Sequence, residues 1–574
     1  MENVGVTLRE SDPVQKPHVP ISRPPPPAAP CAQASRPGHT SVPPRAFVPP
    51  RTPMSRRPAS ARAVRLLPGA LLALLCGCTV GPDFRQPSVW SPTSWFASRP
   101  VVPASYEASL PVAQPIDPAW WKLLGDDKLT ALEERVASQN LNVRLYTVRL
   151  AESRAQLRLS SVNLFPQING QARYQRDQIS QKEIQRGLSS IGGALPASLA
   201  GSASGFGSTQ VPPIDLWSDG IDSSYELDLW GRVRRTVEAA DAALEASTDA
   251  RRNALLSALA EVARDYVQLR GNQELLRIAR ENLATEQQSL VLTRQRSSGG
   301  LGTDLDVAQA AAQVESTRSQ LPQLEQQVQQ GINALSLLLG EGPGALRAEL
   351  EAPGPVPPVP PRVPIGLPSE LVRRRPDIRQ AEATLHSATA QVGVAVASFY
   401  PSVTLSANLT FTALQFRDLG FWSNKGYTLG PNVTIPIFQG GQLRGQLALN
   451  NAQQQEAATN YQQTVLQAWH DVDNALIAYG AEQTRRDALQ RSVEQNQRAL
   501  VLARDRYTQG LSDFLNVLTQ ERSVLAAQQQ LADSIVTETQ NLVQLYKALG
   551  GGWEQSFPAA PDKAAAATGA AAPG

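Results

Sequence analysis

The chain has 574 residues, enough for a large core or several domains, and a formal net charge of +2. A charge this small does not favour a nucleic-acid partner, and the four histidines stand singly rather than at metal-ligand spacing. No nucleophile–base pairing, metal cluster or phosphate-binding loop stands out. The sequence therefore favours a protein that is not an enzyme and that uses no metal or cofactor.

The first part of the chain reads as a leader followed by a secretion signal. Residues 1–53 are rich in proline and lack a periodic apolar pattern, which predicts disorder. Met54 is one of only two methionines and is the predicted true start. Residues 54–77 then read as a signal peptide, because arginines precede the apolar run 66–75, which is too short to span a bilayer.

The end of this signal resembles a lipid-attachment motif. Residues 75–78 (LCGC) are similar to a bacterial lipobox, whose last cysteine becomes the lipidated N-terminus. Cys78 is the expected lipid-attachment residue, and Thr79 after it, in place of aspartate, favours the outer membrane by resemblance to sorted lipoproteins. Residues 78–118 are expected to run in extended form from this anchor to the folded body.

The body is a tandem duplication. One constant offset carries the 4-3-4-3 apolar spacing of residues 255–269 onto 465–479, and Gly300 onto Gly510. The predicted parts are a first repeat, a proline-rich connector, a second repeat and a disordered tail: 119–340, 341–375, 376–553 and 554–574.

Each repeat begins with a helix and continues with two strands. The helices are predicted over 126–164 and 376–399. Residues 402–412 alternate apolar and polar side chains without a fault. Similar alternation predicts three more strands of about ten residues, long enough to cross a bilayer when tilted, over 168–175, 221–229 and 427–437. The Gly- and Ser-rich linker 180–218 is expected to be an exposed loop.

Two very long helices follow the strands. Residues 231–296 and 442–507 contain no proline and predict helices of about 100 Å each, with coiled-coil-like packing. Each ends at a glycine-containing turn, and return helices are predicted over 304–339 and 513–549.

Four further positions carry specific expectations. Thr303 and Ser512 are the predicted N-caps of the return helices. Pro322 is expected to kink or break the first of them. The arginines at 373–375, just before the second repeat, are expected to form a solvated basic approach rather than a site.

The strands dictate an oligomer. Four strands cannot close into a barrel, and open strand edges are not tolerated in lipid. Each chain must therefore combine its strands with those of identical chains, and three chains would supply twelve strands around a wet lumen. The expected fold is mainly α with transmembrane β, in which the duplicated strand–strand–long-helix unit forms a β-barrel that continues as a helical tube.

Motifs in this order resemble the outer-membrane factor (TolC/OprM-like) family, best its NodT-like lipoprotein branch attached to resistance–nodulation–division efflux pumps. They are the lipobox and residues 81–84, 227–232, 374–378 and 507–515. The resemblance implies a homotrimer in the bacterial outer membrane, lipid-anchored, with a twelve-stranded barrel and a periplasmic α-helical barrel. It also implies a periplasmic adaptor protein and an inner-membrane proton-driven pump as partners, and a passive duct for small toxic molecules.

The same resemblance places functional residues at the helical hairpin turns. The adaptor-docking tips are Gly300, Leu301, Gly302, Thr303, Gly510, Leu511, Ser512 and Asp513, although the glycines also serve simply to end helices. The periplasmic gate falls at Leu515, and the aspartate that relatives carry one turn later is Thr519 here. A neutral hydroxyl cannot form a charged ring, and Asp513 is the nearest carboxylate in the sequence.

On the polar strand face, Glu226 and Asp228 would make the barrel lumen acidic and favour cations. Alternatively, they pair with Arg232 or Arg234 near the barrel rim.

Two other functions remain open at this point. The first is the outer-membrane duct of a type I protein secretion system, which keeps the fold and changes the cargo. The second is a pore-less periplasmic coiled-coil structural protein, against which the alternation of residues 402–412 argues.

Overall fold

The computed structural model describes residues 79–88, 92, 95, 109–178 and 213–557. The predicted leader, the signal peptide, Cys78, most of the linker 180–218 and the end of the tail lie outside the described residues. In the described part of the chain, no helix combines the length and the hydropathy that a membrane span requires.

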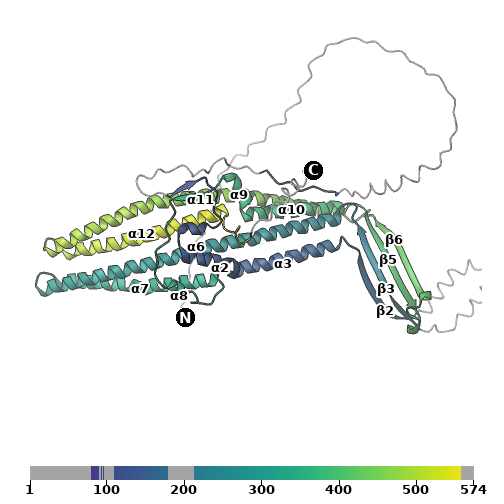
Figure 1. Ribbon diagram of the computed structural model, residues 1–574, viewed down its shortest axis with the longest axis horizontal. Helices are drawn as coiled ribbons and strands as arrows, with labels where there is room; N and C mark the ends of the chain where they lie inside the picture. The colour runs from purple at the N-terminus through teal and green to yellow at the C-terminus, as the bar shows by residue number, and fades with distance from the viewer. Residues whose placement is uncertain (1–78, 89–91, 93–94, 96–108, 179–212, 558–574) are drawn as a thin grey trace, which may run out of the picture. The chain divides into compact units, whose positions relative to one another are not determined.

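One antiparallel sheet joins the two repeats in the order β2-β3-β5-β6 (Figure 1). Its strands are β2 (Gln167–Asp177), β3 (Ile214–Leu227), β5 (Ser402–Ala413) and β6 (Lys425–Thr434). β3 starts inside the predicted linker, because its first residues pair in register with the end of β2. β6 ends before the predicted 437, since Pro436 cannot donate a ladder hydrogen bond.

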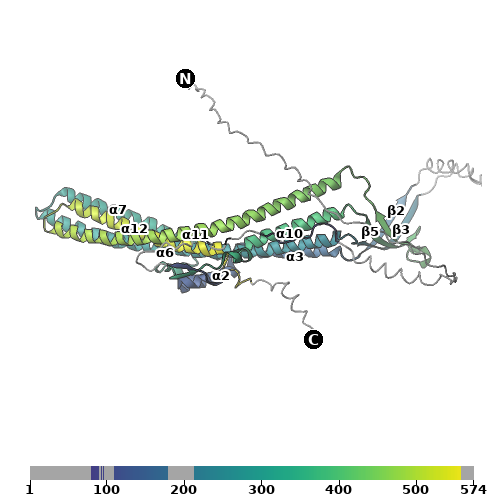
Figure 2. The same ribbon diagram turned by 90° about the horizontal axis from the view of Figure 1, so that it is seen from above.

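Two long hairpins account for most of the helical residues. The long helices α6 (Arg232–Ser298) and α11 (Gln442–Thr508) contain 67 residues each. The return helices are α7 (Asp304–Leu338), which packs on α6, and α12 (Phe514–Leu549), which packs on both α11 and α6 (Figure 2). α12 therefore joins the two hairpins side by side.

Three predictions about the return helices have different outcomes. Thr303 is the N-cap of α7 and forms a capping box with Asp306. The N-cap position of α12 is Asp513, so the prediction of Ser512 is wrong by one residue, and Asp513 makes no side-chain capping bond. The predicted break at Pro322 is also absent, because α7 runs through this residue as one helix packed along α6.

The first predicted helix is in fact two helices, α2 (Asp127–Gln139) and α3 (Leu141–Val162). Asn140 between them is extended, and its side-chain oxygen caps α3 by accepting from the Val143 amide at 3.0 Å. Its amide nitrogen donates to the Leu338 carbonyl at 2.7 Å. Asn140 thus ends one helix, starts the next and fixes the break to the end of α7. The matching helix of the second repeat, α10 (Pro376–Ala397), is continuous, and both α3 and α10 pack on α6.

Short elements cross the middle of the helices. The connector contributes α8 (Arg347–Leu350), β4 (Arg362–Pro364) and α9 (Pro368–Arg374). β4 pairs in parallel with β1 (Leu110–Val112), which comes from the N-terminal segment. The short helix η2 (Trp120–Leu124) follows β1, and η4 (Phe416–Asp418) and η5 (Trp422–Asn424) lie between β5 and β6. The connector is therefore bound to the N-terminal segment by a sheet that the sequence analysis missed.

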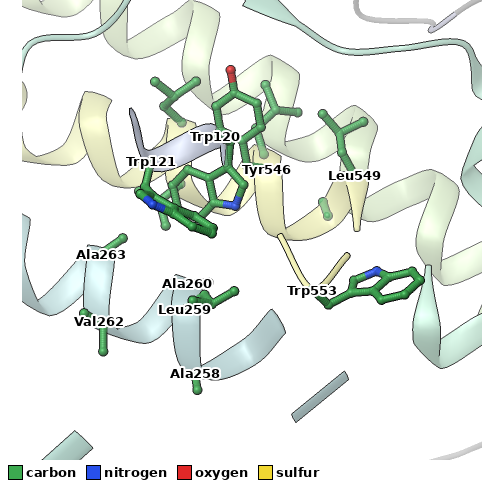
Figure 3. Packing of buried hydrophobic residues seen from close by; sticks show 14 of the residues in the cluster. Trp120, Trp121, Ala258, Leu259, Ala260, Val262, Ala263, Tyr546, Leu549 and Trp553 are labelled. Atoms are coloured by element: carbon green, nitrogen blue, oxygen red, sulfur yellow. The ribbon is translucent and has the colours of Figure 1, made fainter. Parts of the chain in front are cut away.

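The largest apolar core lies at this level (Figure 3). Trp120 stacks on Tyr546 of α12 with ring centroids 5.2 Å apart, and its other face meets Trp121 edge-on. Leu259 and Val262 of α6 and Trp553 after α12 belong to the same cluster. The core thus ties the first repeat to the end of the second.

Glu133 of α2 is an unusual member of this region. Its side chain is buried, and neither carboxylate oxygen accepts a hydrogen bond from a described residue. Burial raises the pKa of Glu133 well above its ordinary value. Because the folded state then holds the proton more tightly than the unfolded chain, this group stabilises the fold at low pH. That contribution is lost as pH rises through the raised pKa.

We expect Glu133→Gln to flatten the dependence of folding stability on pH by up to about 1.4 kcal/mol per pH unit. Denaturant titrations of the parent and the variant at a series of pH values would measure this slope. Glu134→Gln, at the exposed neighbouring position, is the matched control. Parallel pH profiles for the parent and Glu133→Gln would contradict the assignment of a neutral buried acid.

Candidate functional site: strand faces and hairpin turns

The sheet has one apolar and one polar face. Residues paired directly across antiparallel strands share a face, so Val403, Leu405 and Leu409 lie with their partners Leu227, Tyr225 and Ile221. The opposite face carries Thr404, Ser406 and Asn408. On the apolar face, Tyr427 and Leu429 of β6 remain 76% and 70% exposed. Such a sheet suits a barrel wall with lipid outside and water inside.

Both outer strands of the sheet have an open edge. β2 pairs only with β3, and β6 pairs only with β5, among the described residues. In lipid, each unpaired backbone group would cost several kcal/mol. One chain therefore supplies a four-stranded segment of a barrel and needs further strands at both edges.

The two candidate lumen carboxylates are both ion-paired. Glu226 accepts a hydrogen bond from Arg232 Nε at 2.9 Å. Asp228, one residue beyond β3, accepts from the Arg234 amide at 2.9 Å and from Arg234 Nε at 3.2 Å. These are the arginine contacts that the sequence analysis gave as the alternative. Both negative charges are locally balanced, and they fix the first turn of α6 to the end of the strand.

The N-terminal segment begins beside this strand-to-helix junction. The Val80 amide donates to the Trp230 carbonyl at 3.1 Å, and Thr79 packs against Gly231 so closely that an added Cβ would lie 2.8 Å from its methyl group. Trp230 stacks on Tyr400, with ring centroids 4.7 Å apart. The first described residue is thereby held at the base of the sheet.

The two hairpin turns are closed in the same way. Gly300 and Gly510 adopt positive φ angles of 73° and 77°, which other residues adopt at a cost. The next amides, of Leu301 and Leu511, each donate at 2.8 Å to a carbonyl five residues earlier, at Arg296 and Arg506. The side chains of Leu301 and Leu511 are 72% and 64% exposed.

A small core lies directly behind the turns and joins them. Arg296 of α6 donates to the Thr508 carbonyl at 3.0 Å and lies over the ring of Tyr507. Tyr507 meets Phe514 edge-on, with centroids 5.5 Å apart. Leu515 is 56% exposed and points away from this core, while the Thr519 hydroxyl donates back to the Leu515 carbonyl at 2.7 Å. Thr519 therefore has its hydrogen-bond donor occupied within the helix.

A buried polar layer between the hairpins was not predicted. Glu521 of α12 accepts from Arg504 at 2.7 Å and from Ser289 of α6 at 2.5 Å. Glu286 accepts from Gln313 at 3.0 Å, and burial raises the pKa of Glu286. These residues follow the ordinary polar spacing of exposed helix faces, so only the packing of α6 on α12 identifies them.

Arg375 corrects the expectation of a solvated basic approach. Its side chain is 10% exposed, and it donates to Asp377 of α10 at 2.6 Å and to Asp471 of α11 at 3.1 Å. It also donates to the Ala548 carbonyl of α12 at 3.1 Å. Arg373 is exposed, as expected. The prediction is wrong for Arg375 because its acidic partner Asp471 lies 96 residues away in the sequence.

Comparison with known proteins identifies the fold. The family model described as outer membrane efflux protein matches residues 132–341 and 367–551, one segment in each repeat. The chain belongs to the outer membrane efflux protein family. It is 31% identical to the probable efflux pump outer membrane protein TtgC of Pseudomonas putida, over 86% of this chain and 97% of TtgC.

Two further relatives agree. The probable outer membrane lipoprotein SilC of Salmonella typhimurium is 30% identical over 85% of this chain and 99% of its own length. The solved structure of the outer-membrane channel OprN is 33% identical, covers 83% of this chain and all of that chain, and superposes with a TM-score of 0.74.

The predicted family, fold, function, partners and location are confirmed. The protein is an outer-membrane channel subunit of a tripartite efflux system. It acts as a homotrimer, with a barrel in the outer membrane and a helical part in the periplasm, together with an adaptor and an inner-membrane pump. The relatives are channel proteins rather than enzymes. The pore-less coiled-coil alternative is therefore excluded.

Proposed function

We propose that this subunit is the passive exit duct for small toxic molecules, and that its cargo crosses the outer membrane along the polar face of the sheet. The observation that carries this proposal is the amphipathic four-stranded sheet with two open edges. Small cargo is supported by the name of the relative TtgC, an efflux pump protein, whereas no contact in the described residues favours a protein cargo.

We propose that the hairpin turns are the adaptor contacts. Leu301 and Leu511 support this, because exposed leucines at two turns of matched geometry offer apolar anchors to a partner. Gly300, Gly302, Thr303, Gly510, Ser512 and Asp513 shape the same surface.

The double substitution Leu301→Asp and Leu511→Asp should abolish adaptor binding and efflux without unfolding the trimer, because both side chains are already exposed. Co-purification with the adaptor and drug susceptibility of the producing cells would measure the two effects. Leu337→Asp is the matched control, since Leu337 is 70% exposed at the far end of α7. Normal adaptor binding by the double variant would refute the docking proposal.

We propose that Leu515 and Thr519 line the narrow periplasmic end of the duct. The exposed side chain of Leu515 and the occupied hydroxyl of Thr519 suit an apolar constriction rather than a charged ring. Asp513 lies close by in the sequence and is the candidate source of negative charge. An increase in single-channel conductance on Leu515→Ser would support the constriction, and an unchanged conductance would refute it.

We propose that Glu226 and Asp228 act at the base of the barrel lumen. Because Arg232 and Arg234 balance them, they are expected to confer only a weak preference for cations. Cys78 is proposed as the lipid-attachment residue, supported by the position of Thr79 at the base of the sheet. The mass of the N-terminal peptide tests this directly, because an unmodified Cys78 or a different first residue would refute it.

A further inference from the structure

An aromatic cluster marks the end of the sheet farthest from the helices. The connection between β5 and β6 lies there, because α10 precedes β5 and α11 follows β6 at the other end (Figure 1). Phe416, Phe421 and Trp422 of this connection are 66%, 58% and 68% exposed. Three large exposed rings in one short surface connection need a partner other than water.

The register places these rings on the lipid-facing side. Phe411 is on the apolar face of β5, and Trp422 packs against it with ring centroids 6.3 Å apart. Phe416 meets Trp217 at 5.0 Å, and Trp217 meets Tyr174, its direct partner across β2 and β3, at 4.4 Å. The connection therefore folds over the apolar face instead of over the lumen.

Cations lie among these rings. Lys425 pairs with Phe411 across β6 and β5, so it also points to the lipid side, and its ammonium lies 3.9 Å from the centre of the Trp422 ring. It forms no salt bridge with a described residue. Arg417 is 80% exposed and has only a loose contact with Asp418 at 3.7 Å.

The acidic residues of the same face lie elsewhere. Asp215 contacts Arg176 at 3.7 Å and accepts from the Tyr174 hydroxyl at 2.9 Å, both on the side of β2. Asp219 is in the same cross-strand row as Lys425, with β5 between their strands, about 10 Å away. The β6 side of the cluster thus combines exposed rings with an excess of positive charge.

We propose that this surface, Phe416, Arg417, Phe421, Trp422 and Lys425, binds the phosphorylated sugar headgroup of a glycolipid in the outer leaflet. The helices occupy the periplasm, so the far end of the strands reaches the outer leaflet. Aromatic rings settle at the boundary between acyl chains and headgroups and stack on sugar rings. Lys425 and Arg417 supply charge-assisted hydrogen bonds to phosphate.

Native mass spectrometry of the detergent-solubilised trimer, titrated with bisphosphorylated lipid A, tests the proposal. The expected result is a saturable set of bound lipids, with an apparent affinity that falls about tenfold for Lys425→Gln. Trp422→Leu, which keeps an apolar side chain, should weaken binding as well. Lys122→Gln is the control, because Lys122 is similarly exposed but lies in η2, far from the sheet in the sequence.

Two comparisons separate this site from general lipid adhesion. Monophosphorylated lipid A should bind more weakly than the bisphosphorylated form, and phosphatidylglycerol should bind without sensitivity to Lys425→Gln. Equal binding of bisphosphorylated lipid A to the parent and Lys425→Gln, both confirmed as trimers in the same spectra, would overturn the proposal. So would equal sensitivity of phosphatidylglycerol to the substitution, which would mean that charge alone is recognised.

Discussion

Arg375→Met is expected to lower the free energy of unfolding by about 3–5 kcal/mol, because it removes one partner of a buried ionic network. Arg375 is the only described residue that joins the start of α10, the middle of α11 and the end of α12 through its side chain. Without it, the Asp377 and Asp471 carboxylates and the Ala548 carbonyl lose a common donor in a confined space. Methionine keeps much of the side-chain volume, so the loss reports mainly on charge and hydrogen bonding.

Arg373→Met provides the matched control, since Arg373 lies two positions away and is exposed. Its effect should stay within about 0.5 kcal/mol. Arg375→Lys should be nearly as harmful as Arg375→Met, because an ammonium cannot reproduce the planar fork that bridges both carboxylates. The shift in denaturant midpoint of the solubilised protein measures all three variants, and equal midpoints for Arg373→Met and Arg375→Met would contradict the account.

Gly271→Ala and Gly480→Ala are expected to change stability in opposite directions. Both glycines lie inside 67-residue helices, so alanine should stabilise each helix by about 1 kcal/mol through its higher helix propensity. At Gly480 no atom lies within 4 Å of the added Cβ. At Gly271 the added Cβ would lie 2.3 Å from a methyl group of Val536, where α6 packs on α12.

Overpacking of this contact should cost about 1–3 kcal/mol and separate the two hairpins. The difference between the two variants isolates packing from propensity, because the backbone change is the same in both. Val536→Ala should rescue Gly271→Ala by creating room for the new methyl group. If Gly271→Ala were as stable as Gly480→Ala, the close approach of α6 and α12 would be refuted.

Regular patterns made much of this fold predictable. The alternation in 402–412 and the proline-free runs before Gly300 and Gly510 identify β5, α6 and α11 to within a few residues. The duplication then allows one repeat to check the other. Open strand edges and the cost of unpaired backbone in lipid require the oligomer, before any relative is considered.

Features that depend on distant partners were not predictable. Asn140 resembles any polar helix residue until its contact with the Leu338 carbonyl is known. The strands β1 and β4 have three residues each, too few for a recognisable alternation. The charge balance at Glu226 was foreseen only as an alternative, because helix α6 had to start at Gly231 for Arg232 to reach it.

Single-channel recording of the purified trimer in planar lipid bilayers tests the central claim most directly. Discrete pores of uniform conductance from a particle of trimer mass, with at most a weak cation preference, are the predicted result. A trimer with a strong cation preference would keep the duct and contradict the charge balance at Glu226 and Asp228. A monomer or dimer without conductance would contradict the shared barrel, and with it the role of this subunit as a duct.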